Sequence, residues 1–125
     1  MEESRIRTYS PLSLAFLGDA VYSLFVRDFL IRKGNTPVNK LSQRCAKVVS
    51  AKAQAEVIGR LLPMLTEQEL AAYRRGKNAS PKNQAKNATS LEYHMATGFE
   101  SLIGWLYLKE DHERINKLLS EAVNI

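Results

Sequence analysis

The chain has little of what stabilises small secreted proteins or anchors proteins in membranes. It contains one cysteine in 125 residues, Cys45, which cannot form an internal disulfide and so excludes a disulfide-stabilised scaffold. Its most apolar stretch, residues 13–26, is interrupted by Asp19 and is too short to cross a bilayer. The polar N-terminus lacks the apolar core of a signal peptide. We therefore expect a soluble, cytoplasmic protein with no membrane partner.

Strand signals are also missing. No segment alternates between apolar and polar residues for long enough to indicate a β-strand, and neither an internal repeat nor a flexible linker is visible. Hydrophobic residues make up 45% of the chain and charged residues 25%, which is typical of globular proteins. A chain of this length can bury one core. We expect a single all-α domain spanning residues 1–125.

Acidic residues are scarce in the middle of the chain. Residues 27–88 contain thirteen of the eighteen lysines and arginines and carry a net charge of +9. Residues 1–26 carry −1 and residues 89–125 carry −3. Such an asymmetry is typical of a protein that docks on phosphates, although a solvated basic face without a partner would look the same.

Six helices are expected from their start and stop signals. Ser10-Pro11 is a hydroxyl cap followed by a proline at the first helical position, and Thr36-Pro37 repeats this signal. Residues 66–69 and 89–92 are capping boxes, in which threonine and glutamate side chains each bond the other's backbone N–H. A polar loop, residues 78–88, separates the fourth and fifth helices. The expected helices run from Pro11 to about Arg32, from Pro37 to about Val49, after Ser50 to near Leu62, after Thr66 to about Lys77, after Thr89 to about Lys109, and from Asp111 to Val123.

The first expected helix carries apolar residues on every side, which predicts burial in a core or between subunits. Asp19 lies in its middle, and its neighbours one turn away, such as Ala15 and Ser23, offer no cation. A buried carboxylate without a partner is strongly unfavourable or takes up a proton. Asp19 must therefore find a cation, hydrogen-bond donors or a metal elsewhere in the fold.

Glu100 repeats this pattern on the fifth expected helix. It lies beside a core stripe, among the small residues Ala96, Thr97 and Gly104, and no cation lies within one turn of it. Small neighbours let another helix approach closely. Two such carboxylates could share one divalent cation, or each could be a structural acid bonded to the backbone or to a distant arginine.

Two segments resemble the motifs of a known enzyme family. Residues 14–21, Leu-Ala-Phe-Leu-Gly-Asp-Ala-Val, resemble the signature helix of ribonuclease III, and residues 96–104 with the following Leu106-Tyr107-Leu108 resemble that family's second acidic motif. They lie about eighty residues apart, in the expected order. Family members usually carry a double-stranded-RNA-binding domain after the nuclease domain, and this chain ends without one, so it resembles the reduced branch called Mini-ribonuclease III. Residues 49–55, 75–79 and 81–83 look like that branch's own motifs.

The resemblance implies an endoribonuclease that cuts double-stranded RNA and leaves 5′-phosphates. It implies an all-α homodimer with an RNA-binding valley along its two-fold axis, in which Phe16 matches the aromatic residue that plugs into the partner subunit. Asp19 and Glu100 match the catalytic acids that hold Mg²⁺. The implied substrate is the paired stem of precursor large-subunit (23S) ribosomal RNA, with a ribosomal protein as a candidate partner.

Two positions depart from the pattern of full-length ribonuclease III. Ala15 stands where those relatives have a glutamate, and Thr97 stands where they have an aspartate, a thinning that the Mini-ribonuclease III branch shares. The number of metal ions is therefore open, with water and phosphate oxygens expected as the remaining ligands. A catalytically inactive ribonuclease III-like module that binds RNA or ribosomes is the alternative. Retention of Asp19 and Glu100 disfavours it.

Basic residues around the polar loop are the best candidates for RNA contacts, because A-form duplexes are recognised mainly through shape, phosphates and 2′-hydroxyls. Two residues of the branch motifs join them. The expected RNA-binding residues are Lys52, Arg74, Arg75, Lys77, Lys82, Asn83 and Lys86. A basic stripe from Lys40 to Lys52 is the alternative docking surface.

Overall fold

A computed structural model describes residues 1–79 and 89–123 of the chain. Within these ranges the secondary structure is entirely helical, which confirms the all-α prediction. None of the helices found there is both long and apolar enough to cross a membrane. The elements are α1 (Glu3–Ile6), α2 (Pro11–Lys33), α3 (Val38–Val49), α4 (Ala51–Leu61), the 3-10 helix η1 (Leu62–Met64), α5 (Glu67–Ala79), α6 (Ser90–Leu108) and α7 (His112–Ala122).

The helices begin where local hydrogen bonds start them. The Ser10 hydroxyl accepts a bond from the Ser13 N–H at the start of α2, and Ser50 caps α4 in the same way. Both predicted capping boxes are present, at the starts of α5 and α6. These starts were predictable because every partner lies within three residues along the chain.

Two helix boundaries and one short helix differ from the prediction. α3 begins at Val38, because Pro37 has an extended ψ of 142° and itself occupies the N-cap, with no side-chain cap from Thr36. α5 continues to Ala79, so residues 78 and 79 are helical and not part of the expected loop. The four-residue helix α1 was not predicted, since it is too short to show a helical period.

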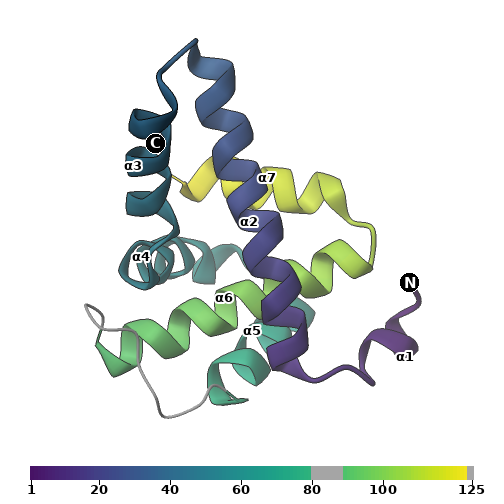
Figure 1. The fold of residues 1–125 in the computed structure, drawn as a ribbon. Coiled ribbons are helices and arrows are strands. Elements are labelled where there is room, and N and C mark those ends of the chain that lie inside the picture. The colour runs from purple at the N-terminus through teal and green to yellow at the C-terminus, as the bar shows by residue number, and fades with distance from the viewer. Residues whose placement is uncertain (80–88, 124–125) are drawn as a thin grey trace.

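α6 lies at the centre of the fold, and α2 lies across it (Figure 1). The two helices meet at glycines: a Cβ on Gly18 would overlap the carbonyl oxygen of Glu100, and one on Gly104 would overlap that of Leu14. α5 approaches a different face of α6, where Gly76 lies against Ser101. Close backbone contact of this kind is possible only without a side chain, and it fixes where α2 and α5 lie along α6.

The core is built mainly from one face of α2 and the middle of α6. Tyr22 of α2 and Phe99 of α6 are fully buried, with their rings edge to face at 5.0 Å. The opposite face of α2 is exposed, including Leu12, Phe16 and Leu24. Of the two predicted forms of burial, in a core or between subunits, the core of one chain accounts for only one side of α2, because α6 and its neighbours cover only that side.

Candidate active site

The two acidic residues singled out in the sequence lie together where α2 crosses α6. Asp19 directly follows Gly18, and Gly18 contacts the backbone of Glu100. The Asp19 and Glu100 side chains lie close enough together for Asp19 to raise the pKa of the Glu100 carboxyl group. The glycine crossing thus brings together two carboxyl groups that are eighty-one positions apart in the chain.

Their environments differ from the prediction. Asp19 is exposed and was wrongly expected to be buried, because Gly18 and not Asp19 faces α6. Glu100 is partly buried. Burial, together with the neighbouring Asp19, raises the pKa of Glu100 to about 8, although a hydrogen bond from Gln54 opposes the rise. Two carboxylates at such close range repel each other unless a proton or a cation lies between them.

Gln54 is a part of the site that the sequence reasoning missed. Its amide Nε2 donates to Glu100 Oε2 at 3.3 Å and to the Val49 carbonyl oxygen at 2.9 Å. Its Oε1 is enclosed and accepts no hydrogen bond in the structure. The signal available in the sequence was a polar residue on the apolar face of α4, one turn before Val57 and Ile58.

The donor set suits a hard divalent cation. Over residues 1–79 and 89–123, no group of three or more His, Cys, Asp and Glu side chains is arranged to hold a metal ion. A cation at this crossing would therefore have only two carboxylate ligands from the described residues, Asp19 and Glu100. Mg²⁺ is often held by one or two carboxylates while it keeps several waters. Ala15 and Thr97 are buried, and the Thr97 hydroxyl donates to the Tyr93 carbonyl oxygen at 3.1 Å. The Thr97 hydroxyl hydrogen is therefore bonded within its own helix, and neither Ala15 nor Thr97 offers a carboxylate to the site.

The predicted RNA-binding residues fall into two groups. Lys52, Arg74 and Arg75 are exposed, and Lys77 is partly buried. Arg75 and Lys77 flank Gly76. Gly76 lies against Ser101, which is next to Glu100 in the sequence. The basic end of α5 therefore lies against the part of α6 that carries Glu100. The remaining candidates, Lys82, Asn83 and Lys86, lie outside the described residues.

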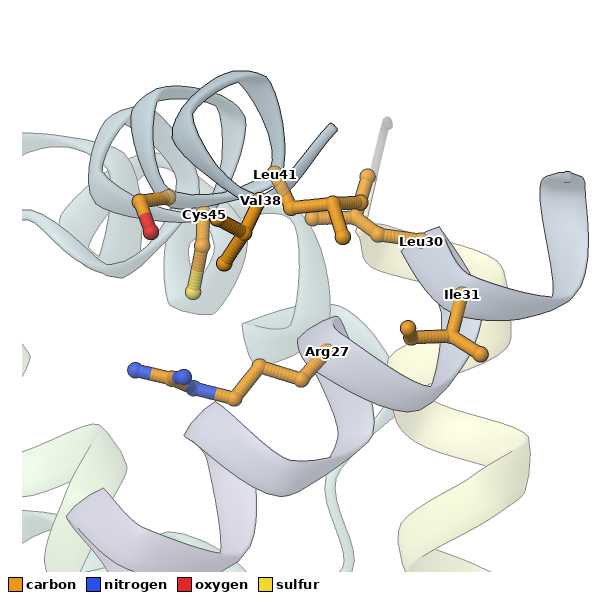
Figure 2. Close-up of a pocket in the computed structure, with 7 residues that line it drawn as sticks. Arg27, Leu30, Ile31, Val38, Leu41 and Cys45 are labelled. Atoms are coloured by element: carbon orange, nitrogen blue, oxygen red, sulfur yellow. The ribbon is translucent and has the colours of Figure 1, made fainter. Parts of the chain in front are cut away.

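A separate hollow of about 300 Å³ lies between α2 and α3, away from the acid pair. Figure 2 shows Leu30 and Ile31 on one side of it, Val38 and Leu41 on the other, and the Arg27 side chain extending beneath α3. Its lining is mainly apolar and contains neither of the paired acids. The acid pair lies outside this hollow, at the α2–α6 crossing, where the exposed Asp19 side chain is accessible to solvent.

The α2–α6 crossing thus holds a pair of carboxyl groups in an all-helical domain, and the family of the chain is shown by comparison with known proteins. Residues 12–111 match the ribonuclease III domain family, and the chain belongs to this family of endoribonucleases, as its motifs predicted.

Its relatives place it more narrowly. It is 49% identical over 120 residues to Mini-ribonuclease 3 of Streptococcus pneumoniae, with 94% of each chain covered. It is also 49% identical over 116 residues to Mini-ribonuclease 3 of Brevibacillus brevis, covering 93% of this chain and 87% of the relative. A crystal structure of a Fusobacterium nucleatum protein superposes with a TM-score of 0.83 at 33% identity, covering 92% of both chains.

Proposed function

We propose that this protein is a Mg²⁺-dependent nuclease that cleaves double-stranded RNA, with Asp19 and Glu100 as its metal-binding catalytic acids. The observation that carries the proposal is the pairing of these two carboxyl groups by the α2–α6 crossing. Partial burial of Glu100 and the closeness of Asp19 make the pair unfavourable as two free charges, and a divalent cation would neutralise both.

Asp19 and Glu100 would have different roles in the site. Asp19 is exposed and therefore accessible to an incoming phosphodiester, whereas Glu100 is partly buried and held by Gln54. A divalent cation bound by both would lower the pKa of a bound water and offset the charge that develops on the phosphate. Attack by water on the phosphorus would leave a 5′-phosphate on one product and a free 3′-hydroxyl on the other.

The exposed face of α2 supports a homodimer. Phe16 is 85% exposed and Leu24 is 68% exposed, one turn on either side of the small residue Ala20. If two copies of α2 cross antiparallel at Ala20, Phe16 of each lies near Leu24 of the other. Leu24 lines a hollow of about 290 Å³ together with Val21 and Phe25, which could receive the ring. Such a self-complementary contact is what a two-fold dimer requires.

The exposed basic residues of α4 and α5 would bind the phosphates of the duplex. A dimer doubles this surface, and recognition through phosphates and shape needs little base specificity. We propose the paired stem of precursor 23S ribosomal RNA as the substrate, a ribosomal protein as an assisting partner, and the cytoplasm as the location of the enzyme. The support for this substrate is the similarity to Mini-ribonuclease 3 and the basic charge of residues 27–88.

The test is cleavage of a duplex RNA by wild-type protein and by Asp19→Asn, with and without Mg²⁺. We expect cleavage only by the wild type with Mg²⁺, because asparagine keeps the shape of the side chain and removes a charged ligand. The variant should remain folded and should still bind the duplex. Wild-type protein that binds duplex RNA without cutting it in Mg²⁺ or Mn²⁺ would instead support the inactive RNA-binding module.

A further inference from the structure

Gln54 is a polar side chain enclosed in the fold beside the acid pair. It is 2% exposed and lies on the same face of α4 as the buried residues Val57, Ile58 and Leu61. Burying an amide is unfavourable unless its hydrogen bonds are made, and an apolar side chain of the same size would avoid that cost. The presence of glutamine at this core position therefore needs an explanation in its hydrogen bonds.

The amide nitrogen connects two parts of the fold. It donates to the carbonyl oxygen of Val49, the last residue of α3, and to the carboxylate of Glu100 in the middle of α6. Both partners are acceptors, so the nitrogen and not the oxygen must face them. The Val49 carbonyl is part of the backbone and cannot move independently, and it therefore fixes the amide in the orientation that holds Glu100.

The amide oxygen has no hydrogen-bond partner in this arrangement. Gln54 Oε1 is enclosed by protein and accepts no hydrogen bond among the described residues. Unsatisfied buried acceptors are uncommon in folded proteins and call for a specific reason. Here the reason is that orienting the nitrogen toward Glu100 and Val49 leaves the oxygen facing the core.

We propose that Gln54 is a positioning residue of the active centre, which orients the Glu100 carboxylate so that its second oxygen is available to the cation. The proposal rests on the proposed metal site at Asp19 and Glu100. Hydrogen-bond partners of metal ligands orient those ligands and raise metal affinity. With Ala15 and Thr97 offering no carboxylate, a site with two acids depends more heavily on the orientation of each.

The structure offers a matched pair of variants for a test. Gln54→Met keeps an unbranched side chain of similar length and removes both hydrogen bonds. Tyr22→Phe removes a comparable buried bond, from the Tyr22 hydroxyl to the Val48 carbonyl oxygen at 3.1 Å, and leaves the donor to Glu100 in place. Both variants lose a bond to the end of α3, and only Gln54→Met affects the acid pair.

Metal affinity gives a readout that is independent of catalysis. Mn²⁺ binding is measured by calorimetry on wild type, both variants and Asp19→Asn, and duplex binding is measured by fluorescence anisotropy in EDTA. We expect Gln54→Met to lower Mn²⁺ affinity roughly 10- to 100-fold, the range found for outer-shell partners of metal ligands, and to lower kcat while KM and duplex affinity stay unchanged. Tyr22→Phe should bind Mn²⁺ as the wild type does.

Two results would contradict the inference in distinguishable ways. Wild-type Mn²⁺ affinity in Gln54→Met, or an equal loss in Tyr22→Phe, means that Gln54 has a structural role only. Failure of the wild type to bind Mn²⁺, or unchanged binding by Asp19→Asn, overturns the proposed metal site itself. If Gln54→Met does not fold by circular dichroism, Gln54→Asn serves as the second variant, because it keeps the amide but is one methylene too short to reach Glu100. The same loss of Mn²⁺ affinity is expected from it.

Discussion

Replacing Glu100 by glutamine should stabilise the metal-free protein at alkaline pH and abolish its activity. Burial and Asp19 raise the pKa of Glu100 from its usual 4.5 to about 8. Between these two values the folded protein keeps a proton at this site that the unfolded chain has released. The stability due to this protonated group is fully present below pH 4.5 and is lost as the pH rises through 8.

The size of the effect follows from the rise in pKa. One pKa unit corresponds to about 1.4 kcal/mol, so the full rise sets an upper limit of roughly 5 kcal/mol. Glu100 is only partly buried, and we therefore expect about 1–3 kcal/mol after allowance for solvent screening. Glutamine can still accept from Gln54 and can donate to Asp19, so the variant gains this free energy without losing the hydrogen bonds.

The assay is urea denaturation in EDTA of wild type, Glu100→Gln and the exposed control Glu56→Gln, at pH 5.5 and pH 8.5. The free-energy difference between Glu100→Gln and wild type should increase with pH, while the control follows the wild type. A free-energy difference that is independent of pH, or a variant that is less stable than wild type at pH 8.5, would refute the argument that the paired carboxylates destabilise the folded protein at alkaline pH. Loss of cleavage by a more stable variant would show that the site sacrifices stability for function.

Three other predictions concern the dimer, the RNA surface and the fold. Phe16→Ala should weaken the dimer by on the order of 3 kcal/mol per ring. The stability of each subunit should be nearly unchanged, because the ring is exposed in the single chain. A wild type that sediments as a monomer at micromolar concentration would contradict the proposed interface. Alanine should be placed at four basic positions together, Arg74, Arg75, Lys77 and Lys82. The slope of log binding constant against log salt concentration, measured by anisotropy on inactive protein, should become shallower by roughly one unit per lost phosphate contact. An unchanged slope would indicate that the duplex binds along the Lys40–Lys52 stripe. Burial alone would raise the pKa of Glu69, but hydrogen bonds from Arg114 and Thr66 lower it, so its contribution to stability is present at neutral pH and lost as the pH falls through the lowered pKa. Glu69 forms an ion pair with Arg114, with 2.7 Å between Glu69 Oε2 and Arg114 Nε. Glu69→Gln should therefore cost about 2–4 kcal/mol at pH 7 and less in acid, and a loss that does not shrink on acidification would argue against this ion pair as its cause.

Local signals predicted the helices well. The capping boxes at residues 66–69 and 89–92 and the serine caps of α2 and α4 each involve atoms within three residues of one another. The structure contains all four of these caps, whereas the hydroxyl cap expected from Thr36 is absent. Helix ends were less predictable: α5 extends to Ala79, and Gly76 in its last turn packs on α6, a contact that depends on tertiary structure.

The candidate site was predicted in part. The sequence identified Asp19 and Glu100, because an acid among apolar or small neighbours is visible without a structure. It did not show that Asp19 is exposed, which depends on Gly18 being the residue that contacts α6. It also did not reveal Gln54, whose bond to Glu100 joins residues forty-six positions apart. Pairings of this kind are set by how α2, α4 and α6 pack together, and no local pattern encodes them.

The most direct test of the central claim is a crystal structure of the protein soaked in Mn²⁺, with the metal located by anomalous scattering. We expect one anomalous peak between the Asp19 and Glu100 carboxylates, with metal–oxygen distances of roughly 2.0–2.3 Å, and with Gln54 still bonded to Glu100. An active protein whose Mn²⁺ lies elsewhere, or whose Asp19 and Glu100 carboxylates do not touch the metal, would contradict it.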